Sequence, residues 1–238
     1  MKILGIDSSG LVASAAVLVD DTVVSEFTVN NKKTHSQTLL PMIDQAVKMS
    51  GILKRDLDAV AVAAGPGSFT GLRIGSSAAK GIAYVLGKPI VSVPTLEGLA
   101  YRLAVTDGLI CPLMDARRNQ VYTGVYQMKE GKLTVRIPQK AADIMEIITE
   151  VNALGEKVTF LGDGVPVQED TIRREVQVPY VFAPSHMNRQ SAAAVAALGA
   201  VYFSEGKVED AMTHRPVYLR KSQAERERSE KLKNDVGA

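Results

Sequence analysis

Residues 2–29 read KILGIDSSGLVASAAVLVDDTVVSEFTV, and short apolar runs alternate in them with tight polar breaks. Residues 2–7 form an apolar run that ends in an acid, residues 12–19 follow a Ser-Ser-Gly turn, and residues 23–29 follow Asp20-Asp21. Short segments rich in β-branched residues and separated by such breaks are typical of an antiparallel meander. We therefore expect three strands to open the chain.

The same organisation returns about a hundred residues later. Residues 109–115 are apolar and again end in an acid, residues 116–119 form a turn, and residues 121–128 and 133–137 follow as strands. Asp7 and Asp115 occupy equivalent places in the two meanders. This recurrence predicts a degenerate internal duplication.

Helices and strands alternate after each meander. In the first half we expect helices over 34–50, 71–86 and 95–103 and strands over 59–64 and 89–93. In the second half we expect helices over 142–151, 167–173 and 191–205 and a strand over 158–162. The pattern predicts an α/β fold with two domains and mixed sheets, covering 1–103 and 104–222, with a charged tail over 223–238. The last helix of the second domain is free to pack back on the first.

Composition excludes several classes of protein. The 238 residues are 46% hydrophobic and 23% charged, which is a globular composition. A net charge of +2 is too small for the chain to attract nucleic acid strongly by its overall electrostatic field, so any RNA contact would need a partner. The single cysteine, Cys111, forms no intrachain disulfide, and the longest apolar run, residues 192–203, is too short to span a membrane. We expect a cytoplasmic protein that has no contact with membranes.

The most distinctive segment is GPGSFTGLRIG, residues 65–75, which follows an apolar strand and opens a helix. Its spacing fits neither the dinucleotide-binding fingerprint nor the Walker A loop, so it is a weak phosphate cradle. Gly67, Gly71, Gly75, Ala79 and Ala83 instead form a stripe of small residues four apart, which lets another backbone approach closely. Internal packing and a partner surface explain this stripe equally well.

The preceding helix favours the partner. Thr34 and Gln37 have the spacing of a capping box, so the helix start is well marked. The apolar residues of this helix cover an arc of roughly 180°, which is wide for a helix that packs on one sheet only. We therefore predict a partner or dimer interface made by two successive helices, with these residues: His35, Leu39, Met42, Ile43, Ala46, Gly71, Gly75, Ala79 and Ala83.

Catalytic and metal-binding patterns are poor. The three histidines, His35, His186 and His214, form no pair at a ligand spacing, and no Gly-x-Ser-x-Gly elbow exists. A weak, vestigial nucleotide site is predicted where acids and glycines follow strands, at Asp7, Ser8, Ser9, Asp115, Gly162, Asp163 and Gly164. The glycine that would follow each strand-end acid and let the backbone reach a phosphate is missing. We predict no catalytic residue and no metal site.

Together these motifs give the chain a resemblance to a known family over essentially its whole length. It resembles the TsaB family, formerly YeaZ, through Ile6–Ser9, His35–Gln37 with Leu40-Pro41, residues 65–75, Asp115–Arg117, Gly162–Gly164 and residues 216–220. The resemblance implies the acetate-kinase, sugar-kinase and actin-like (ASKHA) fold. It also implies a role in making threonylcarbamoyladenosine in tRNA, beside the anticodon.

The resemblance further implies a set of partners. TsaB-type chains resemble degenerate paralogues of the catalytic subunit TsaD, dock it through their first two helices, and work with the ATPase TsaE. We expect a homodimer in isolation, tRNA contact through the complex, no cofactor for the chain itself, and ATP or ADP only in the complex. Residues 101–120 lack the His-x-x-x-His pair of TsaD, so the metal role is not carried over. The alternatives are a stand-alone ATPase or kinase of the same fold and, less favoured, a glycoprotease-like metallopeptidase.

Overall fold

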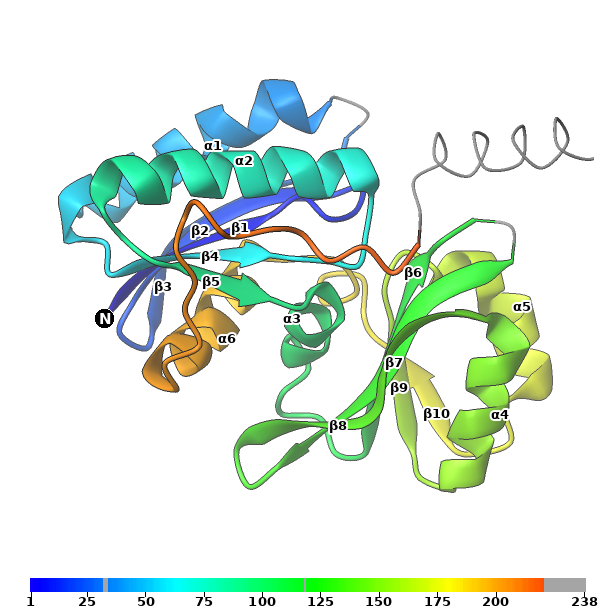
Figure 1. Ribbon diagram of the computed structural model, residues 1–238. Helices are drawn as coiled ribbons and strands as arrows, with labels where there is room; N and C mark the ends of the chain where they lie inside the picture. The colour runs from blue at the N-terminus through cyan, green and yellow to red at the C-terminus, as the bar shows by residue number, and fades with distance from the viewer. Residues whose placement is uncertain (32–33, 118, 221–238) are drawn as a thin grey trace, which may run out of the picture.

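Two five-stranded mixed sheets form the framework of this computed structural model, which describes residues 1–31, 34–117 and 119–220 (Figure 1). The first sheet has the order β3-β2-β1-β4-β5 and the second has the order β10-β9-β6-β7-β8. The strands of the first sheet are β1 (Lys2–Asp7), β2 (Ala13–Val19), β3 (Thr22–Val29), β4 (Ala59–Ala63) and β5 (Ile90–Val93). Those of the second are β6 (Leu109–Asp115), β7 (Gln120–Lys129), β8 (Lys132–Asp143), β9 (Val158–Leu161) and β10 (Tyr180–Phe182).

The predicted duplication is confirmed by the topology. When the second sheet is followed from β8 to β10, its strands correspond one to one with β3 to β5 of the first. In each sheet the first strand pairs antiparallel with the second and parallel with the fourth. Asp7 ends β1 and Asp115 ends β6, so the two acids occupy equivalent positions.

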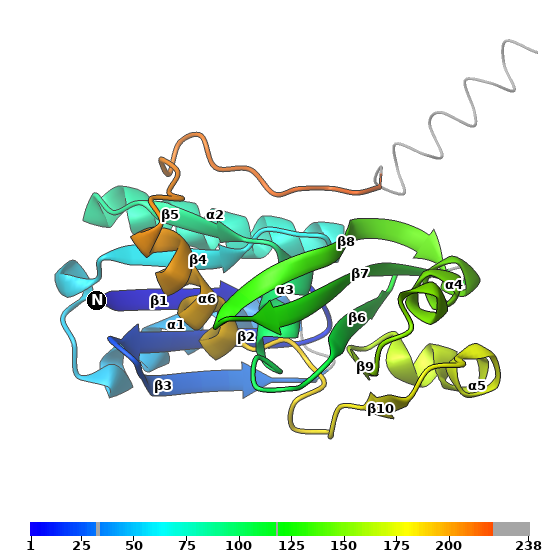
Figure 2. The same cartoon turned by 90° about the horizontal axis from the view of Figure 1, so that it is seen from below.

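Helices follow the strands in the same order in both halves. The first half has α1 (His35–Ser50), the short 3₁₀ turn η1 (Lys54–Asp56), α2 (Phe69–Leu86) and α3 (Thr95–Tyr101). The second half has α4 (Ile144–Leu154), α5 (Val165–Glu175) and α6 (Ala192–Ser204). Figures 1 and 2 show α1 and α2 on one face of the first sheet and α6 on the other. Buried residues of α3 pack with those of β6 and β7, so this helix connects the two sheets.

Although α6 follows the second sheet in the chain, it packs on the first. Its buried alanines and valine meet Ile3, Ala61 and Val91 in one core cluster. The helix comes so close to β1 that a Cβ on Gly5 would collide with the Ala192 carbonyl oxygen. The first sheet is therefore covered on both faces, which accounts for the near-continuous burial of β1, β2 and β4.

After α6 the chain returns along the edge of the first sheet as a segment that we call the C-terminal strap, residues 206–220 (Figure 1). Glu209 pairs with Ile90 of β5, and the Val217 amide donates to the Ala64 carbonyl at 2.7 Å. At its end, Arg220 Nη1 donates to the Ala116 carbonyl just after β6, also at 2.7 Å. The strap thereby fastens the first half of the molecule to the second.

Some local predictions were wrong. Thr34 precedes α1, but its side chain accepts no capping bond from the helix, so the predicted capping box is not formed. Strand β8 extends to Asp143, six residues beyond the predicted end, and β10 was not predicted at all. Among the described residues, no helix is long and apolar enough to cross a membrane. The charged tail predicted over 223–238 lies outside the described residues.

Candidate functional site

The small-residue stripe of α2 packs inside the chain, which corrects its predicted role as a surface. Ala79 and Ala83 are completely buried in the core beneath the helix. A Cβ on Gly71 would collide with the Ser8 carbonyl oxygen, and one on Gly75 would lie 2.5 Å from Ser8 Oγ. The close approach that the glycines allow is made to the turn after β1 and not to a partner.

Most of the wide apolar arc of α1 is likewise used inside the chain. Leu39 and Ala46 are completely buried, and Met42 and Ile43 are at most 8% exposed. These side chains pack in the core cluster with residues of β1, β2 and β4, and α1 contacts β3 as well. The physical reason for the wide arc is that α1 packs on both β2 and β3 and beside α2. These four residues therefore do not form an exposed interface.

The outer faces of the two helices expose different apolar residues. On and just after α1, Leu40 is 56% exposed, Met49 69% and Leu53 54%. At the end of α2, Tyr84 is 67% exposed and Val85 82%. We call these five residues the outer apolar face. The predicted wide arc of the first helix includes Leu40 and Met49, but the predicted interface residues are its buried members, and Leu53, Tyr84 and Val85 were not predicted. The signal was the apolar residues left over once one face of each helix had been assigned to the sheet.

His35 begins α1 and contacts the turn after β1. Its Nε2 lies 2.8 Å from the Gly10 carbonyl oxygen, while its Nδ1 is buried without a hydrogen-bond partner. Both amide atoms of Gln190, close to Gly10, are also buried and unpartnered. This histidine therefore joins the start of α1 to the turn, and it is only partly exposed to a partner.

The predicted phosphate turn, Asp7-Ser8-Ser9, is filled by the chain itself. All three residues are at most 2% exposed. Ser8 Oγ donates to the Gly71 carbonyl at 2.9 Å, and the Ser9 carbonyl accepts from the Ser68 amide at 2.7 Å. The glycine-rich block of residues 65–75 thus owes its composition to close packing over this turn, because a Cβ on Gly67 would collide with the Ser9 carbonyl.

Asp7 is a buried acid in this turn. Its Oδ1 accepts bonds from the Ser9 amide at 2.9 Å and from Ser9 Oγ at 2.6 Å. Burial raises the pKa of Asp7 from 3.8 to about 6, although the two bonds from Ser9 and the nearby His35 oppose the rise. The acid is therefore held in a place that disfavours its charge.

The second predicted turn forms separately. Asp163 Oδ1 accepts from the Asp115 amide at 3.2 Å, and the Gly164 amide donates to the Leu113 carbonyl at 2.9 Å. Burial raises the pKa of Asp163. The structure thus brings Asp115, Gly162, Asp163 and Gly164 together at the end of β6, whereas no bond joins them to Asp7, Ser8 or Ser9 in the described chain. Among those residues, no group of three or more acids, histidines or cysteines is placed to hold a metal ion.

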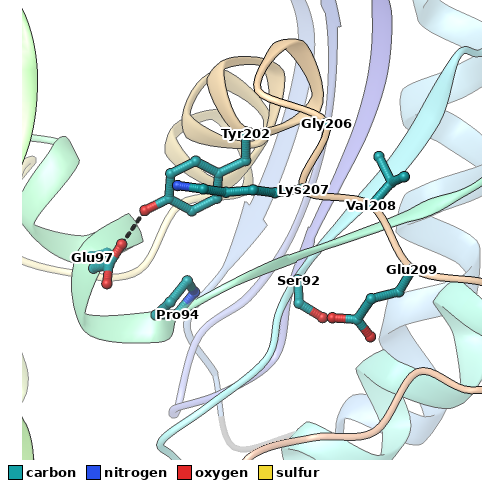
Figure 3. A pocket seen from close by; sticks show the side chains of 8 residues that line it. All are labelled: Ser92, Pro94, Glu97, Tyr202, Gly206, Lys207, Val208 and Glu209. Carbon is teal, nitrogen blue, oxygen red and sulfur yellow. Dashed lines mark hydrogen bonds between the residues drawn. The ribbon is translucent and has the colours of Figure 1, made fainter.

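A hollow of about 450 Å³ lies between β5, α6 and the strap (Figure 3). The Tyr202 hydroxyl donates to the Glu97 carboxylate on one side, and Ser92 and Glu209 lie on the other. Behind Ser92, the buried His214 places Nδ1 2.9 Å from Ser92 Oγ and 3.2 Å from Glu209 Oε2. Because both neighbours meet the same ring nitrogen, this trio lacks the relay geometry of a catalytic triad. It fastens the strap to β5.

Cys111 lies in the middle of β6 and is completely buried. Burial raises the pKa of its thiol to about 12. The thiol is therefore neither ionised nor accessible, and it serves as a small core side chain.

The duplicated mixed sheets with crossover helices give the chain an ASKHA-like fold. The fold is shared with a ROK hexokinase from Thermus thermophilus, with a TM-score of 0.50 at 12% identity over 86% of this chain and all of that one.

Closer relatives define the family. The chain is 36% identical to the tRNA threonylcarbamoyladenosine biosynthesis protein TsaB of Bacillus subtilis (strain 168), over 94% of this chain and 96% of the relative. The structure of YeaZ from Pseudomonas aeruginosa matches with a TM-score of 0.79 at 26% identity, over 92% of this chain and 99% of that one. A family model described as TsaD, tRNA N6-adenosine threonylcarbamoyltransferase, matches residues 22–228. The chain therefore belongs to the TsaB (YeaZ) family.

Proposed function

We propose that this chain is a non-catalytic subunit of a tRNA threonylcarbamoyladenosine transferase, in which it docks and activates a TsaD-type catalytic subunit. The family match to a transferase domain supports this role, because the chain is then a paralogue of the enzyme it would assist. The closed turn at Asp7-Ser8-Ser9 supports a subunit that leaves the chemistry to its partner, since backbone groups of that turn are already bonded within the chain.

The observation that carries the proposal is the outer apolar face of α1 and α2. Five large apolar side chains there are each more than half exposed, although both helices already bury a full face on the sheet. Exposed apolar side chains on neighbouring helices are typical of a helix-to-helix interface. The occupant we propose is the corresponding helix pair of the TsaD-type paralogue, which shares this fold.

The same face suits the homodimer that is expected in isolation. Without the transferase, two copies of this chain would pair through it around a two-fold axis. In the complex, a TsaE-type ATPase would bring ATP or ADP, and tRNA would contact the assembled proteins.

Reconstitution tests this function. Unmodified tRNA, threonylcarbamoyl-adenylate and a TsaD-type transferase should give modified tRNA at a high rate only when this chain is added, and the chain with tRNA alone should give none. Met49→Lys should reduce the stimulation, whereas Val167→Lys, on α5 and 61% exposed, should leave it unchanged. Equal turnover with and without the chain would contradict the proposal.

A further inference from the structure

Arginines without a carboxylate partner gather where α2, the C-terminal strap and the turn after β6 meet. Some arginines of the second half are neutralised by carboxylates: Arg136 pairs with Glu156 at 2.8 Å, and Arg173 pairs with Glu169 at 2.6 Å. By contrast, Arg73, Arg117 and Arg220 form no ion pair with any residue that the structure describes. Their charges remain available to a ligand.

Two aromatic rings connect these arginines. The Arg73 guanidinium carbon lies 4.1 Å from the centre of the Phe69 ring, on the first two turns of α2. The Phe69 ring in turn lies 4.7 Å from the Tyr218 ring of the strap, with 36° between the ring planes. Tyr218 is 38% exposed, so part of this side chain faces solvent.

The C-terminal strap connects these residues to the second half of the molecule. Two residues after Tyr218, Arg220 donates one guanidinium N–H to the Ala116 carbonyl, next to the exposed Arg117. Asp115, the nearest acid along the chain, accepts from the backbone amide of Arg117 at 2.8 Å and leaves the guanidinium unpaired. We call Phe69, Arg73, Arg117, Tyr218 and Arg220 the basic–aromatic patch.

This combination of groups matches the chemistry of RNA. Guanidinium groups bind phosphate oxygens, and exposed aromatic rings and arginine planes stack on unpaired bases. The overall charge of +2 leaves no strong general field, which is why the sequence alone led us to expect RNA contact only with a partner. The structure adds this local cluster, from which affinity of the chain itself would come. We propose that the basic–aromatic patch binds the phosphate backbone of the tRNA that the complex modifies, an inference that rests on the proposed function.

The patch is distinct from the outer apolar face. Phe69 and Arg73 lie in the first turns of α2, whereas Tyr84 and Val85 lie in its last turn. The strap reaches α2 on a side where Lys80 Nζ donates to the Met212 and His214 carbonyls. RNA and a partner helix can therefore be tested with separate substitutions.

The experiment is fluorescence anisotropy of a labelled, unmodified tRNA transcript titrated with the full chain at several salt concentrations. Arg73→Glu should weaken binding about tenfold, and Arg73→Ala should lower the salt slope by about one, because one phosphate contact is lost. Arg55→Glu is the matched control: Arg55 is exposed on η1, after the far end of α1, and forms no ion pair with a described residue, so the net charge changes equally. Arg73→Lys should restore most of the affinity.

Three results would overturn the patch. The first is no saturable binding of the wild-type chain to the transcript at low salt, and the second is that Arg55→Glu weakens binding as much as Arg73→Glu. Alternatively, Arg73→Glu could spare tRNA and weaken the TsaD-type transferase in calorimetry, which would assign the arginines to an acidic protein surface. The tRNA titration uses the chain without the transferase, so it tests the patch alone. Calorimetry of the wild-type chain with the transferase tests the proposed docking separately.

Discussion

Replacing Asp7 by Asn should stabilise the protein at neutral pH. The carboxyl is 2% exposed, and its pKa is raised by burial from 3.8 to about 6. An Asn side chain retains the Oδ1 atom that accepts both bonds from Ser9. The substitution therefore removes a buried charge while keeping the local hydrogen bonds.

The size of the effect follows from the two pKa values. One pKa unit corresponds to about 1.4 kcal/mol, so ionising Asp7 in the folded state costs roughly 3 kcal/mol above pH 6. Between pH 4 and pH 6 the folded state holds more protons than the unfolded state, so the stability due to Asp7 falls as pH rises through this range. After a deduction for burying the amide, we expect Asp7→Asn to gain about 2 kcal/mol at pH 7.5 and almost nothing at pH 4.

Thermal and urea unfolding across pH 4–8 measure this gain. For a chain of this size, about 2 kcal/mol corresponds to a melting temperature higher by roughly 4–8 °C at pH 7.5. Asp21→Asn, at an exposed position, is the control for the same chemical change and should alter little at any pH. A loss of stability in Asp7→Asn that is the same at pH 4 and pH 7.5 would refute the reasoning, because the carboxylate would then be favourably bound.

Three further predictions concern other parts of the chain. Ala79→Leu should lower the free energy of unfolding by about 1–3 kcal/mol in urea, because Ala79 lies in a packed core, and should leave the transferase affinity of the folded fraction intact. Unchanged stability would show that the small-residue stripe does not pack in the core. Burial lowers the pKa of His214 below 6.5, so the unfolded state takes up a proton before the folded state does, and acid should release the strap. Hydrogen exchange at the Val217 amide should therefore rise as pH falls below about 6.5. Exchange that follows only the intrinsic rate would contradict this. Cys111 should react with a thiol reagent only as fast as the protein unfolds, since its thiol is buried with a pKa of about 12, and immediate labelling would show an open core.

The fold was predictable because its strongest signals are local. The apolar runs that end in Asp7 and Asp115 predict the first strand of each half, and their recurrence predicts two sheets of the same topology. The three-residue strand β10 carries too little pattern to be seen, and the strap has no periodicity because single residues, such as Glu209 and Val217, fasten it.

The site was harder to predict because one pattern fits two environments. A stripe such as Gly71, Gly75 and Ala79 has the same spacing whether it packs on its own sheet or on a partner, and only the fold shows that Ser8 fills the space. The basic–aromatic patch joins Phe69 and Tyr218, which are about 150 positions apart in the chain, so no local sequence motif predicts it.

The central claim is that the outer apolar face docks a TsaD-type transferase, and calorimetry of one matched pair of variants tests it most directly. Val85→Lys changes a residue that is 82% exposed on α2, and Val167→Lys makes the same change at a 61% exposed position on α5. Neither should alter folding, because both side chains already face solvent. We predict that Val85→Lys weakens transferase binding at least tenfold, about 1.4 kcal/mol, while Val167→Lys binds like the wild type. Equal affinity of the two variants and the wild type would contradict the account.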